Sequence, residues 1–432
     1  MARVVLNTFG SFGDIHPYLA VAIELNRRGH DAVLATAEVY RRKIEAEGIA
    51  FAPVRPDLGD KFGDTKFIER LWHPRRGTEY LIREYIMPSI EQSYDDLLPA
   101  CANADLLLTH GAAYAGPLVA EKLKLPWLSV ALQPLLFLSA YDKPVLAPAL
   151  WLRHLQFLGP DLMKVVFALA RKQSSAWAEP VRQLRKKAGL PPTRRNPFFE
   201  GQFSSFGTLA LFSKHYAAPQ PDWPRNVQVT GFPFYDRFGE GLPHQPRTDE
   251  AAQLSRFLDS GPPPVLFTLG SSSVMHPGTF YRESFEAARR LGMRAVLLVG
   301  ATSKEQFPEP IPASIHIASY APYSDIMPRC EVLVHQGGIG TTAQALRAGR
   351  PMIVVPWSHD QPDNAHRVSR LGVGRTVPRG QYTARRIERE LQIILHTNTY
   401  ARAAKELKEK IAPESGVVTA CDVIENVIGA AC

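Results

Sequence analysis

The sequence predicts an α/β protein of two domains, each built on a parallel sheet. The first observation is length, because 432 residues exceed the usual size of one domain. The second is a regular alternation of short apolar runs with helical patterns. The third is an interruption of that alternation in the middle of the chain. The composition, 45% hydrophobic and 21% charged, is that of an ordinary globular protein.

The first forty residues predict a strand, a glycine-rich turn, a helix and a second strand. The apolar runs are Val4 to Leu6 and Ala32 to Ala35, and the helical pattern extends from Pro17 to Arg28 and ends at Gly29. This order opens a doubly wound domain, whose ligand usually binds at the turn after the first strand. Further strands are expected at Leu106 to Leu108, Trp127 to Ala131 and Leu209 to Phe212.

The alternation lapses after Asp236 into a stretch rich in glycine, proline and charge. We therefore expect an N-terminal domain over 1–236, a linker over 237–262 and a C-terminal domain over 263–432, whose last helix is free to pack back on the N-terminal domain. A cleft between two such domains is the natural site. Strands of the second domain are expected at Val265 to Leu269, Ala295 to Val299, Ile315 to Ala318, Glu331 to His335 and Met352 to Pro356.

The charge of the chain disfavours nucleic acid as a partner. Fifty Lys and Arg against 42 Asp and Glu give a net charge of +8, but the basic residues are scattered rather than gathered in one stripe. A mild positive charge suits anionic phosphates or a peripheral position at an anionic membrane, and plain solvated helix faces explain it equally.

The cysteines and the apolar runs indicate a cytoplasmic protein. No export signal and no run of about 20 apolar residues is expected. Four widely separated cysteines form no metal-binding pattern, and we expect them to be reduced: Cys101, Cys330, Cys421 and Cys432.

The glycine-rich turn within Val332 to Ala365 is the densest chemical signal. Its glycines allow close approach of the backbone to an anion, and Thr341 stands at the start of a helix, where the dipole favours phosphate. No Lys follows the glycines, so the turn is not a P-loop, and its spacing is not that of dinucleotide-binding proteins. A glycine turn that only packs is the alternative.

This segment, VLVHQGGIGTTAQALRAGRPMIVVPWSHDQPDNA, resembles the C-terminal signature of glycosyltransferase family 1, which has the GT-B fold of two facing Rossmann-like domains. The opening GSFGDIHPYLAVAIELNRRGH is similar to bacterial sterol and antibiotic glycosyltransferases of that family, and APQPDWPRNVQVTGFPFYD looks most like the rhamnosyltransferases of rhamnolipid synthesis. The resemblance implies an inverting enzyme that moves a hexose from UDP-glucose or dTDP-rhamnose to a hydroxyl of a small apolar acceptor, such as a lipid, sterol or flavonoid.

The same resemblance implies a donor site without metal or cofactor. In the family, the nucleotide and diphosphate are bound at positions matched by Ser271, Tyr320, Ala321, His335, Gly338, Gly340 and Thr341, and the sugar at Asp360 and Gln361. Tyr320 replaces the tryptophan of plant members, which leaves the base open. His335 is alternatively a satisfied structural histidine, Tyr320 a core tyrosine, and Ser271 part of a strand-ending turn.

On the acceptor side, Asp14 matches the general base of bacterial members, three residues before Pro17. Asp14 also suits the cap of a helix that begins near Ile15, and His16 is then the rival base. His110 is either a second polar contact to the acceptor or a plain strand-end residue, and Gln133 is a further candidate. We expect acceptor specificity between 132 and 190, with Trp151, Phe157 and Phe167 as candidates.

Two other functions stay open. A UDP-N-acetylhexosamine epimerase of the same fold would need acidic groups rather than an apolar acceptor region. A non-catalytic sugar-nucleotide-binding partner would have no use for Asp14. The oligomeric state cannot be read from the sequence.

Overall fold

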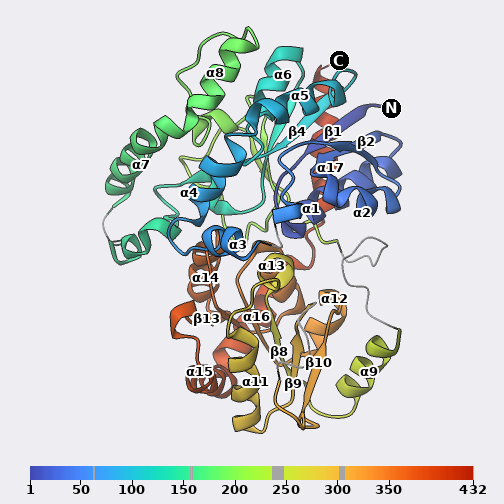
Figure 1. Ribbon diagram of the computed structural model, residues 1–432, viewed down its shortest axis with the longest axis vertical. Helices are drawn as coiled ribbons and strands as arrows, with labels where there is room; N and C mark the ends of the chain where they lie inside the picture. Colours follow the sequence, from blue (N-terminus) through green and yellow to red (C-terminus); the bar gives the residue numbers. More distant parts are fainter. Residues whose placement is uncertain (62–63, 156, 158, 236–247, 301–306, 432) are drawn as a thin grey trace. The chain divides into compact units, whose positions relative to one another are not determined.

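The computed structural model describes residues 1–61, 64–155, 157, 159–235, 248–300 and 307–431. These residues form two compact units (Figure 1). Unit 1 contains Met1–Tyr235 and the C-terminal segment from Glu414, and unit 2 extends from Thr248 to Pro413. The expected linker, 237–262, lies outside the described residues up to 247, and its remainder contains helix α9, Thr248–Asp259.

The sheet of unit 1 has seven parallel strands in the order β3-β2-β1-β4-β5-β6-β7. The strands are β1 Arg3–Asn7, β2 Asp31–Thr36, β3 Ala50–Pro53, β4 Leu106–His110, β5 Trp127–Ala131, β6 Thr208–Ala210 and β7 Val227–Val229. The helices are α1 Phe12–Arg27, α2 Arg41–Ala46, α3 Thr65–Leu71, α4 Gly77–Leu81, α5 Ile90–Ala100, α6 Gly116–Leu123, α7 Pro160–Ser174, α8 Glu179–Lys187 and α17 Gly416–Ala431.

The sheet of unit 2 has six parallel strands in the order β10-β9-β8-β11-β12-β13. The strands are β8 Val265–Thr268, β9 Ala295–Leu298, β10 Ile315–Ala318, β11 Val332–His335, β12 Met352–Val354 and β13 Gly374–Thr376. Besides α9, the helices are α10 Gly270–Ser273, α11 Phe280–Leu291, α12 Tyr323–Ile326, α13 Ile339–Ala348, α14 Gln361–Arg370, α15 Ala384–His396 and α16 Asn398–Ile411.

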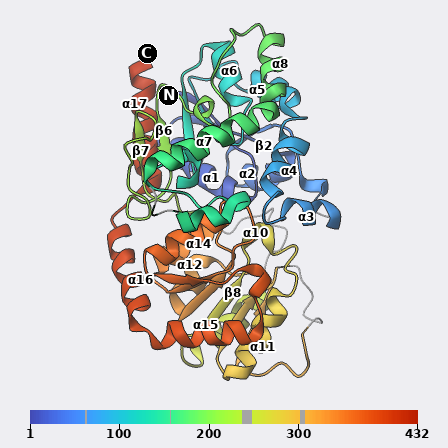
Figure 2. The same ribbon diagram turned by 90° about the vertical axis from the view of Figure 1, so that its left-hand side faces the viewer.

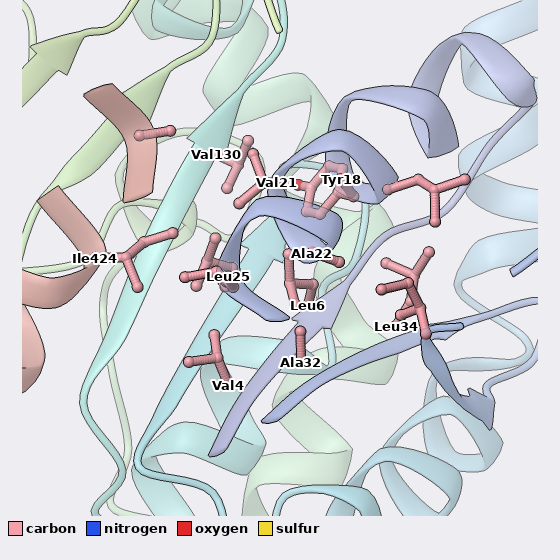
Figure 3. Packing of buried hydrophobic residues seen from close by; sticks show 14 of the residues in the cluster. Val4, Leu6, Tyr18, Val21, Ala22, Leu25, Ala32, Leu34, Val130 and Ile424 are labelled. Carbon is pink, nitrogen blue, oxygen red and sulfur yellow. The ribbon is translucent and has the colours of Figure 1, made fainter. Parts of the chain in front are cut away.

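Successive residues of a strand point to opposite faces of the sheet, and helices cover both faces of the unit 1 sheet. Val4 and Leu6 of β1 are fully buried in a cluster that includes Leu25 of α1 and Ile424 of α17 (Figure 3). Val5 lies in a second cluster, which α5, α6 and α8 cover. Each fully buried side chain of this size stabilises the fold by about 2 kcal/mol. The last helix of the chain therefore completes the core of the N-terminal unit.

The first helix begins earlier than the sequence pattern indicated. We expected the helix from Pro17 and a helix start near Ile15, but α1 begins at Phe12. Ser11 is its N-cap, and the Asp14 side chain accepts a hydrogen bond from the Ser11 backbone, which forms a capping box. This local pairing fixes the helix start, and Pro17 lies inside the helix.

Each sheet changes direction of winding at one pair of strands. In unit 1 this point lies between β1 and β4, and in unit 2 between β8 and β11. Ligands of doubly wound sheets bind outside the carboxyl ends of the strands at such a point. Asp14 follows β1 and His110 ends β4, while Ser271 follows β8 and the glycine turn follows β11.

None of the helices formed by the described residues is both long enough and apolar enough to cross a membrane. Cys101, Cys330 and Cys421 are buried and free. The fourth cysteine lies outside the described residues.

Candidate functional site

Asp14 lies in the first turn of α1, at the carboxyl end of β1. Its Oδ2 accepts a hydrogen bond of 2.8 Å from the Ser11 backbone N–H, and 29% of its side chain is exposed. Burial raises the pKa of the Asp14 carboxyl, while the nearby His110 and the Ser11 hydrogen bonds act in the opposite direction. Asp14 is therefore a capping residue that also keeps an accessible carboxylate.

His110 is brought next to Asp14 by the neighbouring strand. Its Nε2 lies 3.9 Å from Oδ1 of Asp14, and its Nδ1 accepts a hydrogen bond of 3.3 Å from the backbone N–H of Ala112. Burial lowers the pKa of His110, and Asp14 partly offsets this. A neutral ring that accepts at Nδ1 carries its proton on Nε2, so its N–H faces the carboxylate. The sequence analysis placed each residue at a strand end but did not predict this pair.

His16, the rival base, lies two residues further along α1, on the opposite side of the helix. Its ring packs between Phe12 and Tyr235, with centroid distances of 5.2 and 4.8 Å. Its Nε2 is buried, and burial lowers its pKa to about 4. His16 is thus part of an aromatic cluster and is directed away from His110.

A cavity of about 1060 Å³ in unit 1 extends from the end of β4. His110 and Gly111 line one part of it, and α6, α7, α8 and the segment 191–206 supply most of the rest. Gln133, two residues beyond β5, is not among the described residues that line this cavity. Trp151 and Phe157 are 61% and 80% exposed, and Phe167 lies half-buried on α7.

The wall of this cavity is apolar with several basic residues. Tyr114, Leu118 and Trp127 belong to the apolar part. Arg185 forms two hydrogen bonds with Glu121, at 2.7 and 2.8 Å, so this guanidinium is neutralised. The cavity can hold a bulky apolar molecule next to His110.

The glycine turn of unit 2 leads directly into α13. Gly337 has a φ of 90°, and a Cβ atom there would lie 2.5 Å from Cγ1 of Val354, so this position requires glycine. Gly338 is the N-cap of α13, and no side chain caps this helix. The amide groups of the first turn therefore remain available, and together with the helix dipole they favour an anion such as phosphate.

His335 is fully buried beneath this turn. Its Nδ1 accepts a hydrogen bond of 3.0 Å from the Gly337 backbone, and its Nε2 lies 3.3 Å from the sulfur of Met352. Burial lowers its pKa to about 3, so the ring is neutral at physiological pH. Both nitrogens are engaged inside unit 2, and the ring supports the shape of the turn.

A polar cluster that the motif analysis missed connects the ends of β8 and β11. The hydroxyl groups of Thr268 and Tyr323 share a hydrogen bond of 2.9 Å, and Nε2 of Gln336 donates to Oγ1 of Thr341 at 3.5 Å. Oε1 of Gln336 is buried without a hydrogen-bond partner among the described residues. A Cβ on Gly270 would lie 2.3 Å from Nε2 of Gln336, so the two turns are in close contact.

Ser271 is exposed on the short helix α10, directly after this contact. Thr341, in contrast, is almost completely buried. The hydroxyl of Ser271 and the first amides of α13 thus lie at the carboxyl ends of adjacent strands, β8 and β11. Their adjacency could be predicted only once the strand order was known.

Asp360 and Gln361 lie at the start of α14 and are linked to the glycine turn. Asn364 donates from Nδ2 to the carbonyl of Gly337 at 2.9 Å and to Oδ2 of Asp360 at 2.7 Å. Gln361 accepts at Oε1 from the backbone of Trp357 at 2.8 Å. The structure therefore brings together the expected phosphate turn and the expected sugar-binding pair.

Tyr320 and Ala321 follow β10, which β9 separates from β8. Tyr320 is half-buried and Ala321 is buried. Both side-chain oxygens of Glu250 accept hydrogen bonds from Ser319, at 2.7 and 2.6 Å, and these bonds hold the loop. Tyr323, three residues after Tyr320, belongs to the polar cluster at the ends of β8 and β11.

Two family models match the chain. Residues 4–140 match the N-terminal domain of glycosyltransferase family 28, and residues 283–424 match the C-terminal domain described as erythromycin biosynthesis protein CIII-like. The first range includes Asp14 and His110, and the second includes the glycine turn, Asp360 and Gln361.

The chain is 31% identical over 430 residues to O-mycaminosyltylonolide 6-deoxyallosyltransferase of Streptomyces fradiae, with 98% of this chain and 97% of the relative covered. It is 28% identical over 435 residues to a sterol 3-beta-glucosyltransferase of Emericella nidulans. This match covers 98% of the chain but only 30% of the larger relative.

Solved structures share the fold at low identity. The calicheamicin glycosyltransferase CalG4 superimposes with a TM-score of 0.72 at 17% identity, covering 99% of this chain and 98% of that one. The glycosyltransferase VinC, solved in complex with dTDP, gives 0.67 at 18% identity, covering 99% and 100%. The expected fold class, two α/β domains with parallel sheets, is confirmed.

Proposed function

The chain belongs to the GT-B glycosyltransferases of the family 28 and EryCIII-like group, and on this premise we propose that it transfers a hexose, with inversion, from a nucleoside diphosphate sugar to a hydroxyl of an apolar natural product or lipid. The uncapped N-terminus of α13 beside Ser271 carries the proposal, because it offers several N–H donors to one anion.

The diphosphate binds at this helix end. The amides from Gly338 to Thr341 and the hydroxyl of Ser271 stabilise the negative charge that grows on the departing diphosphate. His335 acts by holding the Gly337 amide in place. Tyr320 and Ala321 are proposed to contact the base.

Asp360 and Gln361 hold the sugar. The carboxylate accepts hydrogen bonds from sugar hydroxyls, while the amide nitrogen of Gln361 donates, because its oxygen already accepts from Trp357. Asn364 connects this pair to the phosphate turn, so that sugar and diphosphate are held in one orientation.

Asp14 acts as the general base. Its carboxylate accepts the proton of the acceptor hydroxyl as that oxygen attacks the anomeric carbon. The bond from the anomeric carbon to the diphosphate oxygen breaks, and the diphosphate leaves with the bonding electron pair. Nε2 of His110 faces the carboxylate from 3.9 Å, beyond hydrogen-bond range, and its electrostatic effect favours the charged form of Asp14.

The acceptor occupies the cavity of unit 1. Its apolar wall suits acceptors such as the sterol and the O-mycaminosyltylonolide in the names of the relatives, and His110 places the cavity next to the base. His16 and Gln133 are not assigned a role in this proposal.

The donor is proposed to be dTDP-linked. VinC and the spinosyn rhamnosyltransferase SpnG have both been solved with thymidine diphosphate, and dTDP-rhamnose is one of the two donors expected from the sequence. UDP-glucose is the second candidate, because the sterol relatives are glucosyltransferases. No metal or further cofactor is assigned, and EDTA should leave the rate unchanged.

Thermal unfolding with dTDP, UDP and their sugars tests the donor site. The preferred nucleotide should raise the melting temperature most, by mass action. Mass spectrometry of reactions with panels of donors and apolar alcohols then tests transfer. Release of an epimerised free sugar without acceptor would instead support the epimerase. Nucleotide binding without any product would support the non-catalytic alternative. The relatives described above are all named as glycosyltransferases, and this favours neither the epimerase nor the non-catalytic partner.

A further inference from the structure

Helix α9 packs along β10, the edge strand of the unit 2 sheet (Figure 1). The ring of Phe257 on α9 stacks on the ring of His316 on β10, with a centroid distance of 5.3 Å. Glu250, in the first turn of α9, contacts Ser319, which directly follows β10. The helix therefore runs antiparallel to the strand. A segment that the sequence pattern assigned to the linker is thus attached to the sheet of unit 2.

Every polar group of Ser319 forms a hydrogen bond. Its backbone N–H donates to Oε1 of Glu250 at 2.7 Å, and its hydroxyl donates to Oε2 at 2.6 Å. Its carbonyl accepts from the backbone N–H of Gly300 at 3.1 Å. Hydrogen bonds to a carboxylate are stronger than those between neutral groups. Ser319 is therefore a fixed point at the start of the loop that follows β10.

The same loop has a second fixed point at its other end. The hydroxyl of Tyr323 on α12 shares a hydrogen bond of 2.9 Å with that of Thr268 at the end of β8 (α12 and β8 in Figure 2). Ala321 precedes a proline, which disfavours helical backbone at Ala321. Pro322 itself is extended, with φ of −61° and ψ of 133°. Tyr320 and Ala321 thus lie on a short loop that is anchored on both sides.

We propose that Glu250 is a positioning residue for recognition of the nucleobase. The inference rests on the proposed function, in which Tyr320 and Ala321 contact the base of the donor. Anchoring the loop before the nucleotide binds removes an ordering cost from binding. A fixed loop also distinguishes better between ligands of different shape than a loop that can adapt to both. Glu250 therefore controls how well the site separates dTDP from UDP, and it does so through Ser319 rather than by contact with the nucleotide.

Calorimetric titration of the full chain with dTDP and with UDP tests this role. The wild type should bind one of the two at least about tenfold more tightly than the other. Glu250→Ala removes both bonds to Ser319. It should raise the Kd of the preferred nucleotide by about tenfold and reduce the preference to about threefold or less.

Two further variants test the route through Ser319. Ser319→Ala removes only the hydroxyl bond, so the Kd of the preferred nucleotide should rise by about threefold. The Glu250→Ala and Ser319→Ala double variant should bind no more weakly than Glu250→Ala alone, because both changes remove the same contact. Additive effects of the two substitutions would overturn this route.

Asp249→Ala is the matched control, because Asp249 is an exposed acidic residue in the same turn of α9. It should leave both Kd values unchanged. The melting temperature of Ser319→Ala without nucleotide should match that of the wild type, so that its effect on the Kd reports on the loop rather than on the fold.

The role of Glu250 is overturned if Glu250→Ala keeps the wild-type preference or weakens the binding of both nucleotides equally, as a purely structural residue would. It is also overturned if Asp249→Ala lowers the preference as much, or if the wild type binds dTDP and UDP equally well. Failure of the wild type to bind either nucleotide would instead refute the proposed donor site, and the role of Glu250 with it.

Discussion

Nε2 of His110 lies 3.9 Å from Oδ1 of Asp14, while Nδ1 of the same ring accepts a hydrogen bond from Ala112. The ring is thereby held in one tautomer, with its N–H directed at the carboxylate. Two strands that meet at the winding change of the unit 1 sheet place an acid and a histidine together. This relationship governs the pH dependence that we expect for transfer.

Removing His110 should move the acidic limb of the pH-rate profile. Asp14 must be ionised to act as base, and burial raises its pKa, so the rate falls as pH drops through that raised pKa. His110 lowers the pKa of Asp14, and His110→Leu should therefore shift the acidic limb to higher pH. His110→Gln keeps an N–H donor and should shift it less. If all three proteins have the same acidic limb, His110 does not influence the base.

Asp14→Asn should separate catalysis from helix capping. The amide oxygen still accepts from Ser11, so the fold should survive, but transfer should fall by about 10²-fold or more. Donor binding, measured by calorimetry, should be unchanged. Ser11→Ala is the counterpart, because it should cost about 1 kcal/mol of stability with a smaller effect on rate. Near-normal transfer by Asp14→Asn would refute the assignment of the base.

Two glycines of the phosphate turn should respond differently to substitution. A Cβ on Gly340 would meet no atom within 4 Å, so Gly340→Leu should fold normally but fill the proposed phosphate space, raising the donor Kd about tenfold or more. Gly337→Ala should lower stability by about 2–4 kcal/mol, because of its positive φ and the contact with Val354. Normal nucleotide binding by Gly340→Leu would place the diphosphate elsewhere.

His335 should make the protein less stable at acidic pH. The unfolded chain takes up a proton on this histidine below about pH 6.5, whereas the folded chain does so only at a pKa of about 3. Unfolding therefore binds a proton in this window, and stability falls by about 1.4 kcal/mol per pH unit as pH drops. In urea unfolding, the free energy of unfolding of His335→Asn should therefore change less between about pH 6 and about pH 4 than that of the wild type. An unchanged slope would mean that the folded ring is protonated near its ordinary pKa.

Sequence reasoning could predict the strands because each is a short apolar run buried on both faces, as at Trp127–Ala131. It could also place Asp14, His110 and the glycine turn at strand ends. It missed β3, β7 and β13, which are short strands at or near sheet edges with weak apolar patterns. Such strands depend on a neighbour more than on their own residues.

The supporting contacts of the site could not be predicted from the sequence. Gln336 and Asn364 lie within the quoted glycine-rich segment and Tyr323 lies outside it, but the contacts that these three residues make depend on which strands are adjacent. The pairing of His335 with Met352 likewise requires the register of β11 with β12. Residue type and spacing indicate where a ligand binds, but not which side chains maintain the conformation of the binding site.

The return of α17 to unit 1 has a consequence for anyone who recombines these proteins. Arg28, the C-cap residue of α1, forms ion pairs of 2.7 Å with Asp422 and Glu425 of α17, and Ile424 is buried in the core of unit 1. A chimaera joined at a single crossover near residue 240 would give unit 1 a foreign last helix. Exchange of donor specificity between relatives therefore calls for two crossovers, with 414–432 inherited from the same parent as the N-terminal half.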